Sequence, residues 1–463
     1  MRDRVLFLTG HLAEPRLKQV LEDLAPEFDW EIRDIGIQVA GLMTVDLIRK
    51  RLPRAPVDAT RVIVPGRTRG DLDALGREMD LSFERGPDDL NDLPRFFNAE
   101  ANPVDLSQHN VRIFAEIVDA PVLTVAEIVA LGRELASEGA DVIDIGCLPD
   151  TPFDHLEQAI AALHEVGLKV SVDSANPDDL RRGGLAGCDF ILSLNETTID
   201  LAMEMAAIPV VIPTTPEDPE SLYRAIEIME QRGLPYIADP ILAPVPFGFA
   251  KSLVAYEEAR RRLPGQRILM GVGNATELMD ADTTGINAVL FGIIAELGIT
   301  DVLAVRASPH CRRSIIEADH ARRLMFAAAA SGRLPIDIDT GLMALRDRRP
   351  FTATPASIAE TAEGIRDANY RIEVAEDGIH VYNRDGHHIT QDAFSLYSKL
   401  NVEADGGHAF YLGVELARAE IAFKLGKRYV QDEDLDWGTA VTRREVDLLS
   451  HKLAGPTIKK GRE

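Results

Sequence analysis

A regular alternation of strand-like and helix-like segments between residues 111 and 330 constrains this chain more than any other feature of its sequence. Eight short runs of apolar and β-branched residues are separated by segments whose apolar residues follow a helical spacing. Strands are expected at residues 111–117, 141–145, 168–172, 189–193, 208–212, 235–238, 267–270 and 301–304. Eight strand–helix units of this length are typical of a (β/α)8 TIM barrel. A doubly wound open sheet is the structural alternative.

The helices of these units are expected at residues 124–138, 154–166, 176–185, 197–206, 217–232, 248–262, 275–297 and 312–330. Before them, residues 1–105 also alternate strand and helix patterns, and residues 87–103 are rich in Asp, Asn and Pro, as at a domain boundary. After them, Glu376-Asp-Gly lies between two β-rich runs and indicates a hairpin. Helices are expected near residues 390–400 and 408–425. The sequence therefore predicts an N-terminal α/β domain (1–105), a barrel (108–335) and a small C-terminal α+β domain (345–463).

Composition excludes several classes of protein. The 463 residues carry a formal charge of −25, which disfavours nucleic acid and anionic membranes as partners. No apolar run approaches the roughly 20 residues that a membrane span needs, and the N-terminus lacks a cleavable signal pattern. Three widely spaced cysteines indicate neither a disulfide framework nor a zinc module. We therefore expect a cytoplasmic protein.

Polar residues and glycines follow the expected barrel strands at the ends where a TIM barrel carries its active site. They are Asp144 after the second strand, Asp173 after the third, Asn195 after the fourth, Asp239 and Lys251 after the sixth, Gly271, Gly273 and Asn274 after the seventh, and Arg306 and Ser308 after the eighth. Taken singly, each has a structural alternative. A strand-end Asp or Asn also caps helices or forms turns, and Lys251 also suits a solvent-facing position.

Taken together, these groups suit a pterin. Its aminopyrimidinone ring presents an N–H and an exocyclic amine that carboxylates accept, while an Asn side chain both donates and accepts. A buried polar edge left without a partner costs about 1–3 kcal/mol, so each partner has to be supplied. The ordered set at the strand ends therefore predicts a pterin site in the barrel mouth.

The order of these motifs resembles the pterin-binding superfamily, which includes dihydropteroate synthases and methyltetrahydrofolate-dependent corrinoid methyltransferases. The resemblance covers about residues 108–335. It is carried by residues 139–146 (Gly-Ala-Asp-Val-Ile-Asp-Ile-Gly), 170–174 (Val-Ser-Val-Asp-Ser), Asn195, 238–240 (Ala-Asp-Pro) with 248–251 (Gly-Phe-Ala-Lys), and 271–274 (Gly-Val-Gly-Asn).

Several loop motifs differ from those of the dihydropteroate synthases, and these differences indicate a narrower family. Their loops after strands 1 and 2 are replaced by Phe114-Ala-Glu-Ile-Val-Asp-Ala-Pro and Cys147-Leu-Pro-Asp-Thr-Pro, and their Arg-x-His after strand 8 keeps Arg306 but has Ser308. These departures point away from ordinary folate synthesis. Residues 271–282 (Gly-Val-Gly-Asn-Ala-Thr-Glu-Leu-Met-Asp-Ala-Asp) and 408–420 instead resemble the dihydropteroate synthase-related proteins of archaea and methylotrophs, over nearly the whole chain.

That narrower resemblance implies a role in tetrahydromethanopterin biosynthesis and one-carbon metabolism. The implied enzyme is a transferase that joins 6-hydroxymethyl-dihydropterin diphosphate to an arylamine phosphate. Asp144, Asp173, Asn195, Asp239, Gly271, Gly273, Asn274, Arg306 and Ser308 would bind substrate, with Asp173, Arg306 and Lys251 as catalytic residues. Arg306, Ser308 and the helix start at residues 312–313 would meet the diphosphate, with Mg2+ as an optional counter-ion.

Two alternatives stay open. A methyl or one-carbon transferase that uses a reduced pterin is favoured by Asn274, and a non-catalytic pterin-binding or assembly protein is favoured by the missing catalytic-type lysine and histidine. A homodimer also stays open. No dedicated metal site is expected, since the C-terminal histidines (His380, His387, His388 and His408) match no ligand spacing. The Thr9-Gly10-His11 loop is expected to be a plain turn, because one glycine does not make a phosphate loop.

Overall fold

A computed structural model describes residues 3–38, 40–52, 59–66, 68–87, 90, 93–97, 104–148 and 151–442. Part of the expected boundary at 87–103, residues 149–150 of the loop after the second barrel strand, and the chain beyond residue 442 lie outside these ranges. The chain forms two compact units, Met1–Asp105 and Leu106–Glu463. None of the described helices is long and apolar enough to cross a membrane.

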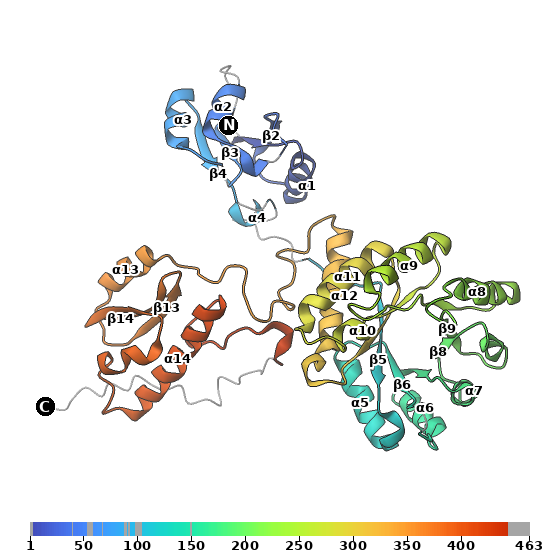
Figure 1. The fold of residues 1–463 in the computed structure, drawn as a ribbon. Coiled ribbons are helices and arrows are strands. Elements are labelled where there is room, and N and C mark those ends of the chain that lie inside the picture. Colours follow the sequence, from blue (N-terminus) through green and yellow to red (C-terminus); the bar gives the residue numbers. More distant parts are fainter. Residues whose placement is uncertain are drawn as a thin grey trace. The chain divides into compact units, whose positions relative to one another are not determined.

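The first unit is a small parallel α/β domain (Figure 1). Its strands are β1 (Arg4–Thr9), β2 (Asp29–Asp34), β3 (Arg61–Val64) and β4 (Ser82–Arg85), and its helices are α1 (Glu14–Leu24), η1 (Ala40–Leu42), α2 (Val45–Arg51), α3 (Leu72–Met79) and α4 (Leu93–Phe96). The strand order is β2-β1-β3-β4 and all pairings are parallel. β2 therefore pairs with one edge of β1 and β3 with the other, so the chain crosses β1 between β2 and β3.

The second unit begins with eight parallel strands. They are β5 (Arg112–Ile117), β6 (Val142–Gly146), β7 (Lys169–Asp173), β8 (Phe190–Leu194), β9 (Ile208–Val211), β10 (Ile237–Ala238), β11 (Leu269–Gly271) and β12 (Asp301–Val305), in the order β10-β9-β8-β7-β6-β5-β12-β11. A single parallel bridge between Ala238 and Ile268 joins the two outer strands, with the Ala238 amide donating to the Arg267 carbonyl at 3.0 Å. The sheet is thus a closed (β/α)8 barrel, and the open-sheet alternative is wrong.

Helices surround these strands, as Figure 1 shows. They are α5 (Val125–Ser137), α6 (Leu156–Glu165), α7 (Pro177–Leu185), α8 (Glu220–Arg232), α9 (Phe249–Arg262), α10 (Gly273–Thr276), α11 (Thr283–Leu297) and α12 (Ser314–Ala330), with short 3-10 turns η3 (Ala120–Val122), η4 (Ile199–Met203) and η5 (Pro309–Cys311). Two expectations were wrong. The helix expected at 197–206 is the short turn η4, and the one expected at 275–297 is interrupted between Thr276 and Thr283.

The barrel interior is arranged in layers. Phe114, Val142, Phe190, Leu192, Val210, Ile237 and Leu269 form an apolar cluster of their own, separate from the larger core between strands and helices. Side chains on a strand alternate between its two faces, so residues two positions further along point the same way. Glu116, Asp144 and Asp239 stand two positions after Phe114, Val142 and Ile237. The sequence thus places carboxyl groups directly above the apolar layer.

The rest of the unit is an α+β segment. It contains α13 (Pro355–Gly364), an antiparallel sheet of β13 (Arg371–Ala375), β14 (Gly378–Asn383) and β15 (Gly386–Thr390), η6 (Ala393–Lys399), α14 (Gly406–Leu425) and η7 (Gly438–Ala440). The expected hairpin is present, whereas β15 and α13 were not anticipated. A side-chain contact links this segment to the barrel, because the Arg313 guanidinium donates to the Thr439 carbonyl at 2.8 Å.

Candidate functional site

The mouth of the barrel, at the C-terminal ends of its strands, begins with Asp144. Its strand neighbours in register are Glu116 on β5 and Ser171 on β7. Asp144 is fully buried, and Ser171 Oγ donates to its Oδ1 at 2.5 Å. Its Oδ2 has no hydrogen-bond partner among the described residues. Burial, then the negative charges of Asp173 and Glu116, raise the pKa of Asp144 well above its usual value, which favours the neutral acid.

Glu116 is a site residue that sequence reasoning missed. Burial, followed by the charges of Asp173 and Glu277, raises the pKa of Glu116 to about 7. A carboxyl group with this pKa exchanges protons at neutral pH, as general acids and bases do. The signal was available in the strand alternation, since Glu116 follows Phe114 on the interior face.

Asp173 stands at the end of β7. Ser193 Oγ donates to its Oδ1 at 2.9 Å, and Ser193 has a left-handed backbone with φ 73°. Such a conformation is uncommon outside glycine and often marks a functional site. Burial raises the pKa of Asp173, and the hydrogen bond from Ser193 offsets only part of this effect.

Asp239 follows the last residue of β10. Tyr256 Oη donates to its Oδ1 at 2.7 Å and the Ile241 amide donates to the same oxygen at 2.8 Å. Burial raises the pKa of Asp239 to about 6 despite these two hydrogen bonds. The two donors fix the orientation of the carboxyl group. Since both of them bind Oδ1, Oδ2 is the atom available to a ligand.

The end of the seventh barrel strand, β11, contributes the side-chain amide of Asn274 and open space beside the backbone of Gly271. Asn274 Nδ2 donates to the Leu242 carbonyl at 2.7 Å, which ties the β11 end to the loop after β10. A Cβ at Gly273 would lie 2.8 Å from Val305 Cγ2, so a side chain there would displace its neighbour. A Cβ at Gly271 would meet nothing within 4 Å, and this backbone therefore borders open space.

Two of the predicted residues have local surroundings that match their structural alternatives. Asn195 Oδ1 accepts from the Thr197 amide at 2.9 Å and from Thr197 Oγ1 at 2.6 Å, as in a turn. Lys251 lies on α9 and is exposed. A role for either in ligand binding stays a prediction.

Two of the groups expected to bind an anion after β12, Arg306 and Ser308, are engaged with carboxylates. Arg306 donates to Glu134 at 2.9 Å and to Glu138 at 3.2 Å, both in or next to α5. The hydroxyl of Ser308 donates to Glu277, as does its amide at 3.3 Å. Burial acts to raise the pKa of Glu277, but the hydrogen bonds from Cys311 and Ser308 outweigh it, and the pKa is lowered. Glu277 is therefore an ionised carboxylate beside the expected anion donors.

Five carboxyl groups thus face one barrel mouth: Glu116, Asp144, Asp173, Asp239 and Glu277, here called the carboxyl cluster. Burial, together with the charges of neighbouring carboxyl groups, raises the pKa values of Glu116, Asp144 and Asp239, whereas the pKa of Glu277 is lowered. Closely spaced acids of this kind share protons and titrate as a group. They can accept hydrogen bonds from N–H groups of a ligand, and they can deliver or receive a proton.

Comparisons with known proteins were made for the sequence and for the structure. Residues 3–88 match the model of a family of unknown function, DUF6513. An uncharacterized protein of Methanocaldococcus jannaschii, MJ0107, is 26% identical, with 93% of this chain and 99% of that protein aligned.

Among solved structures, the chain is similar to dihydropteroate synthases. The enzyme of Xanthomonas albilineans in complex with 7,8-dihydropteroate is 21% identical, with a TM-score of 0.37, and the match covers 49% of this chain and 95% of that one. The enzyme of Thermus thermophilus in complex with 6HMPPP is 17% identical, with a TM-score of 0.38, and the match covers 48% and 95% of the two chains.

Proposed function

We propose that the barrel mouth binds a pterin and transfers a one-carbon group carried by it. The observation that supports this proposal is the carboxyl cluster above the apolar layer. A pterin presents adjacent N–H donors, and Asp239, oriented by Tyr256 and Ile241, offers Oδ2 to accept one of them. Asp173, oriented by Ser193, offers a second acceptor.

Proton transfer gives the cluster a chemical role. When a methyl group leaves a ring nitrogen of a reduced pterin for a soft nucleophile, the nitrogen keeps the electron pair of the broken bond and takes up a proton. Glu116, with a pKa of about 7, can supply that proton and regain it from solvent. Cys147 does not suit the acceptor role, because burial raises the pKa of its thiol to about 12. The nucleophile is therefore a second substrate or a partner.

The condensation of a pterin diphosphate with an arylamine is the second candidate. It requires donors for the diphosphate, but Arg306 is paired with Glu134 and Glu138, and Ser308 is bound to Glu277. A diphosphate would have to displace these carboxylates. Mg2+ bound to the diphosphate would reduce that repulsion and needs no dedicated protein cage, but the pairing of Arg306 and Ser308 would still have to be broken. The geometry therefore favours the one-carbon reaction.

The remaining parts of the proposal rest on the sequence motifs. The altered loops after strands 1 and 2 fit a pterin of the tetrahydromethanopterin class, whose arylamine bears a ribofuranosyl phosphate. Asn274 after strand 7, where the corrinoid methyltransferases carry Ser-Asn, fits a reduced pterin. We include a cytoplasmic location and a role as a transferase in the proposal.

Replacing Asp239 with alanine is expected to weaken dihydropterin binding about 5- to 150-fold. The reason is that a donor on the pterin would face no acceptor, which costs about 1–3 kcal/mol. Calorimetry with 7,8-dihydropterin measures the change, and Asp173→Ala serves as a second test. Asp200→Asn is the control, because Asp200 is exposed and pairs with Arg232 away from the mouth. Unchanged affinity in both Asp239→Ala and Asp173→Ala would refute the pterin site.

A diphosphate on the pterin is not expected to improve binding to the parent protein. The carboxyl cluster repels it, and both Arg306 and Ser308 are bound to carboxylates. Titrating 6-hydroxymethyl-dihydropterin and its diphosphate, with Mg2+ present, compares the two. Glu277→Gln is expected to improve binding of the diphosphate selectively. If the parent instead prefers the diphosphate and Arg306→Ala removes that preference, the condensation reaction replaces the one-carbon reaction as the proposal.

A further inference from the structure

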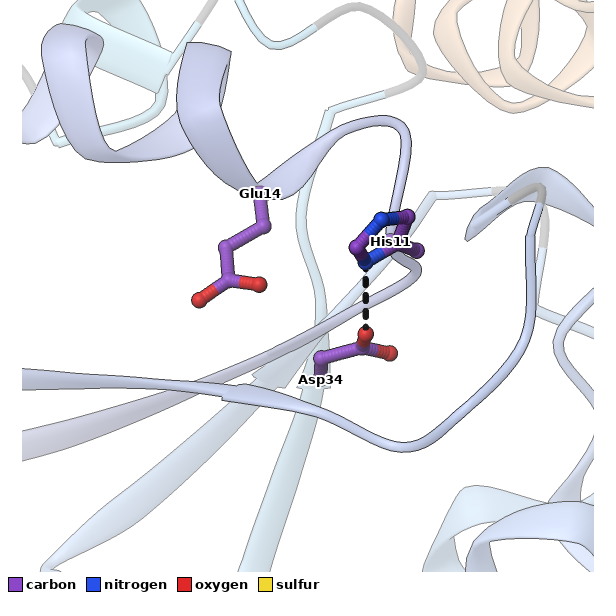
Figure 2. Close-up of side chains that lie close together, drawn as sticks. All are labelled: His11, Glu14 and Asp34. Carbon is purple, nitrogen blue, oxygen red and sulfur yellow. Dashed lines mark ion pairs between the residues drawn. The ribbon is translucent and has the colours of Figure 1, made fainter.

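The first unit brings together three side chains that can bind a metal ion. His11 lies in the loop after β1, Glu14 is the first residue of α1, and Asp34 is the last residue of β2. One ligand atom from each lies within 4.8 Å of the others. Figure 2 shows the Glu14 carboxylate beside the paired His11 and Asp34 side chains. We call these three residues the His11 triad.

Close packing of two backbone loops positions His11. A Cβ at Gly10 would lie 2.7 Å from the Ile37 carbonyl oxygen, so only glycine allows the loop after β1 to approach the loop after β2. The His11 amide donates to that same carbonyl at 2.8 Å. Thr9 pairs with Asp34 in the sheet. The backbone of His11 is thereby fixed beside the end of β2, where its imidazole pairs with Asp34.

The donor atoms fit a small cation. His11 Nδ1 lies 3.5 Å from Asp34 Oδ2. Two ligands of a tetrahedral ion with bonds of about 2.1 Å are about 3.4 Å apart, so this pair already has the right separation. Asp34 Oδ1 accepts from the Gly36 amide at 2.7 Å, which orients the carboxylate. Glu14 adds a second carboxylate, whose charge the ion would neutralise.

A cavity beside the triad is an independent sign of a ligand site. It has a volume of about 280 Å³ and lies at the carboxyl ends of β1, β3 and β4. Leu12 and Ala13, the residues between His11 and Glu14, belong to its wall, as do Thr9 and Gly66. Ligands of open parallel sheets bind at this edge, where the strand order changes direction, as it does here between β1 and β3.

We propose that the His11 triad binds a divalent first-row transition ion of the Zn2+ class. One imidazole and two carboxylates suit Zn2+ better than Mg2+ or Ca2+, which prefer oxygen ligands alone. Three protein ligands leave a position open for water or a bound molecule, as in catalytic zinc sites. The neighbouring cavity provides room for that molecule. Small rotations of Glu14, a half-buried side chain at a helix start, complete the ligand set.

Zinc titration of the full-length protein tests the proposal. We expect the parent to bind one Zn2+ that is lost or weakened at least about 10-fold in His11→Ala and Asp34→Asn. Changes to groups that merely support a ligand already weaken metal binding about 10- to 100-fold, and removing a ligand should do no less. Isothermal calorimetry gives stoichiometry and affinity, and Co2+ absorption reports the coordination geometry.

His164→Ala is the matched control. His164 also forms a surface pair with an aspartate, Asp189, at 3.0 Å, but no third donor of the described residues joins them. Its Zn2+ binding is expected to equal that of the parent. Fluorescence of Trp30, in β2, verifies that each variant keeps the first unit folded. If His11→Ala does not fold, the Zn2+ affinity of Asp34→Asn tests the proposal. Equal stoichiometry and affinity in the parent and the folded triad variants would overturn the proposal.

Discussion

Replacing Phe114 with alanine is expected to lower the free energy of unfolding of the barrel by about 3–5 kcal/mol. Phe114 is fully buried in the interior layer and packs edge-to-face on Phe190, with ring centroids 5.0 Å apart. The loss combines the transfer free energy of the ring with the cavity that it leaves. The guanidinium groups of Arg112 and Arg267 also lie near the Phe190 ring, at 5.8 and 5.4 Å from its centroid, so removing Phe114 would loosen their support as well.

Urea unfolding followed by far-UV circular dichroism measures this loss. Tryptophan fluorescence is unsuitable, because Trp30 and Trp437 both lie outside the barrel. Phe394→Ala is the control, since the Phe394 side chain is 91% exposed and should contribute little. A loss below about 1 kcal/mol for Phe114→Ala would mean that the interior is not packed as described.

The second large effect is a pH dependence caused by Glu116. Its pKa is about 7 in the folded protein, above the ordinary value of 4.5. The folded state therefore retains a proton that the unfolded chain releases above about pH 4.5. The resulting contribution to stability is complete below that pH and is lost as the pH rises through 7. A shift of this size corresponds to about 3 kcal/mol at most.

Glu116→Gln is expected to remove this contribution to the pH dependence. The parent should lose more stability than the variant between pH 5 and pH 8, by about 2–3 kcal/mol, because glutamine carries no proton to release. Urea midpoints at several pH values measure the difference between the two proteins. Glu134→Gln is a useful control, since the hydrogen bond with Arg306 lowers the pKa of Glu134 instead. Parallel pH profiles for the parent and Glu116→Gln would contradict the assignment.

The barrel strands could be predicted because each one is a short apolar run followed by a helical pattern. The misassigned helices have local causes. At Asn195 the side chain forms a turn with Thr197, which leaves only a 3-10 turn where a helix was expected. Residues 277–282 are not helical, so the helix expected at 275–297 is divided into α10 and α11. The strand β15 was missed because its sequence, Gly-His-His-Ile-Thr, has only one strongly apolar residue.

The candidate site could be predicted in part, from the residues that stand at the ends of the expected strands. Asp144 lies within β6, Asp173 ends β7 and Asp239 directly follows β10, and their positions came from the apolar runs of these strands. The pairing of Arg306 with Glu134 and Glu138 depends on residues about 170 positions away in sequence, which no local pattern reveals. The His11 triad was missed for the same reason, since Asp34 reaches it from a neighbouring strand.

The closure of the barrel at β10 has a consequence for how a ligand enters and leaves. This strand is two residues long, and one bridge joins it to the β11 side. A seam with so few hydrogen bonds has a low free energy of local opening compared with global unfolding. Asp239 follows that strand directly, so opening of the seam would move this acceptor away from the others. If the mouth binds a pterin as proposed, ligand occupancy and barrel closure are thermodynamically linked, and the bound pterin would slow amide hydrogen exchange along the seam.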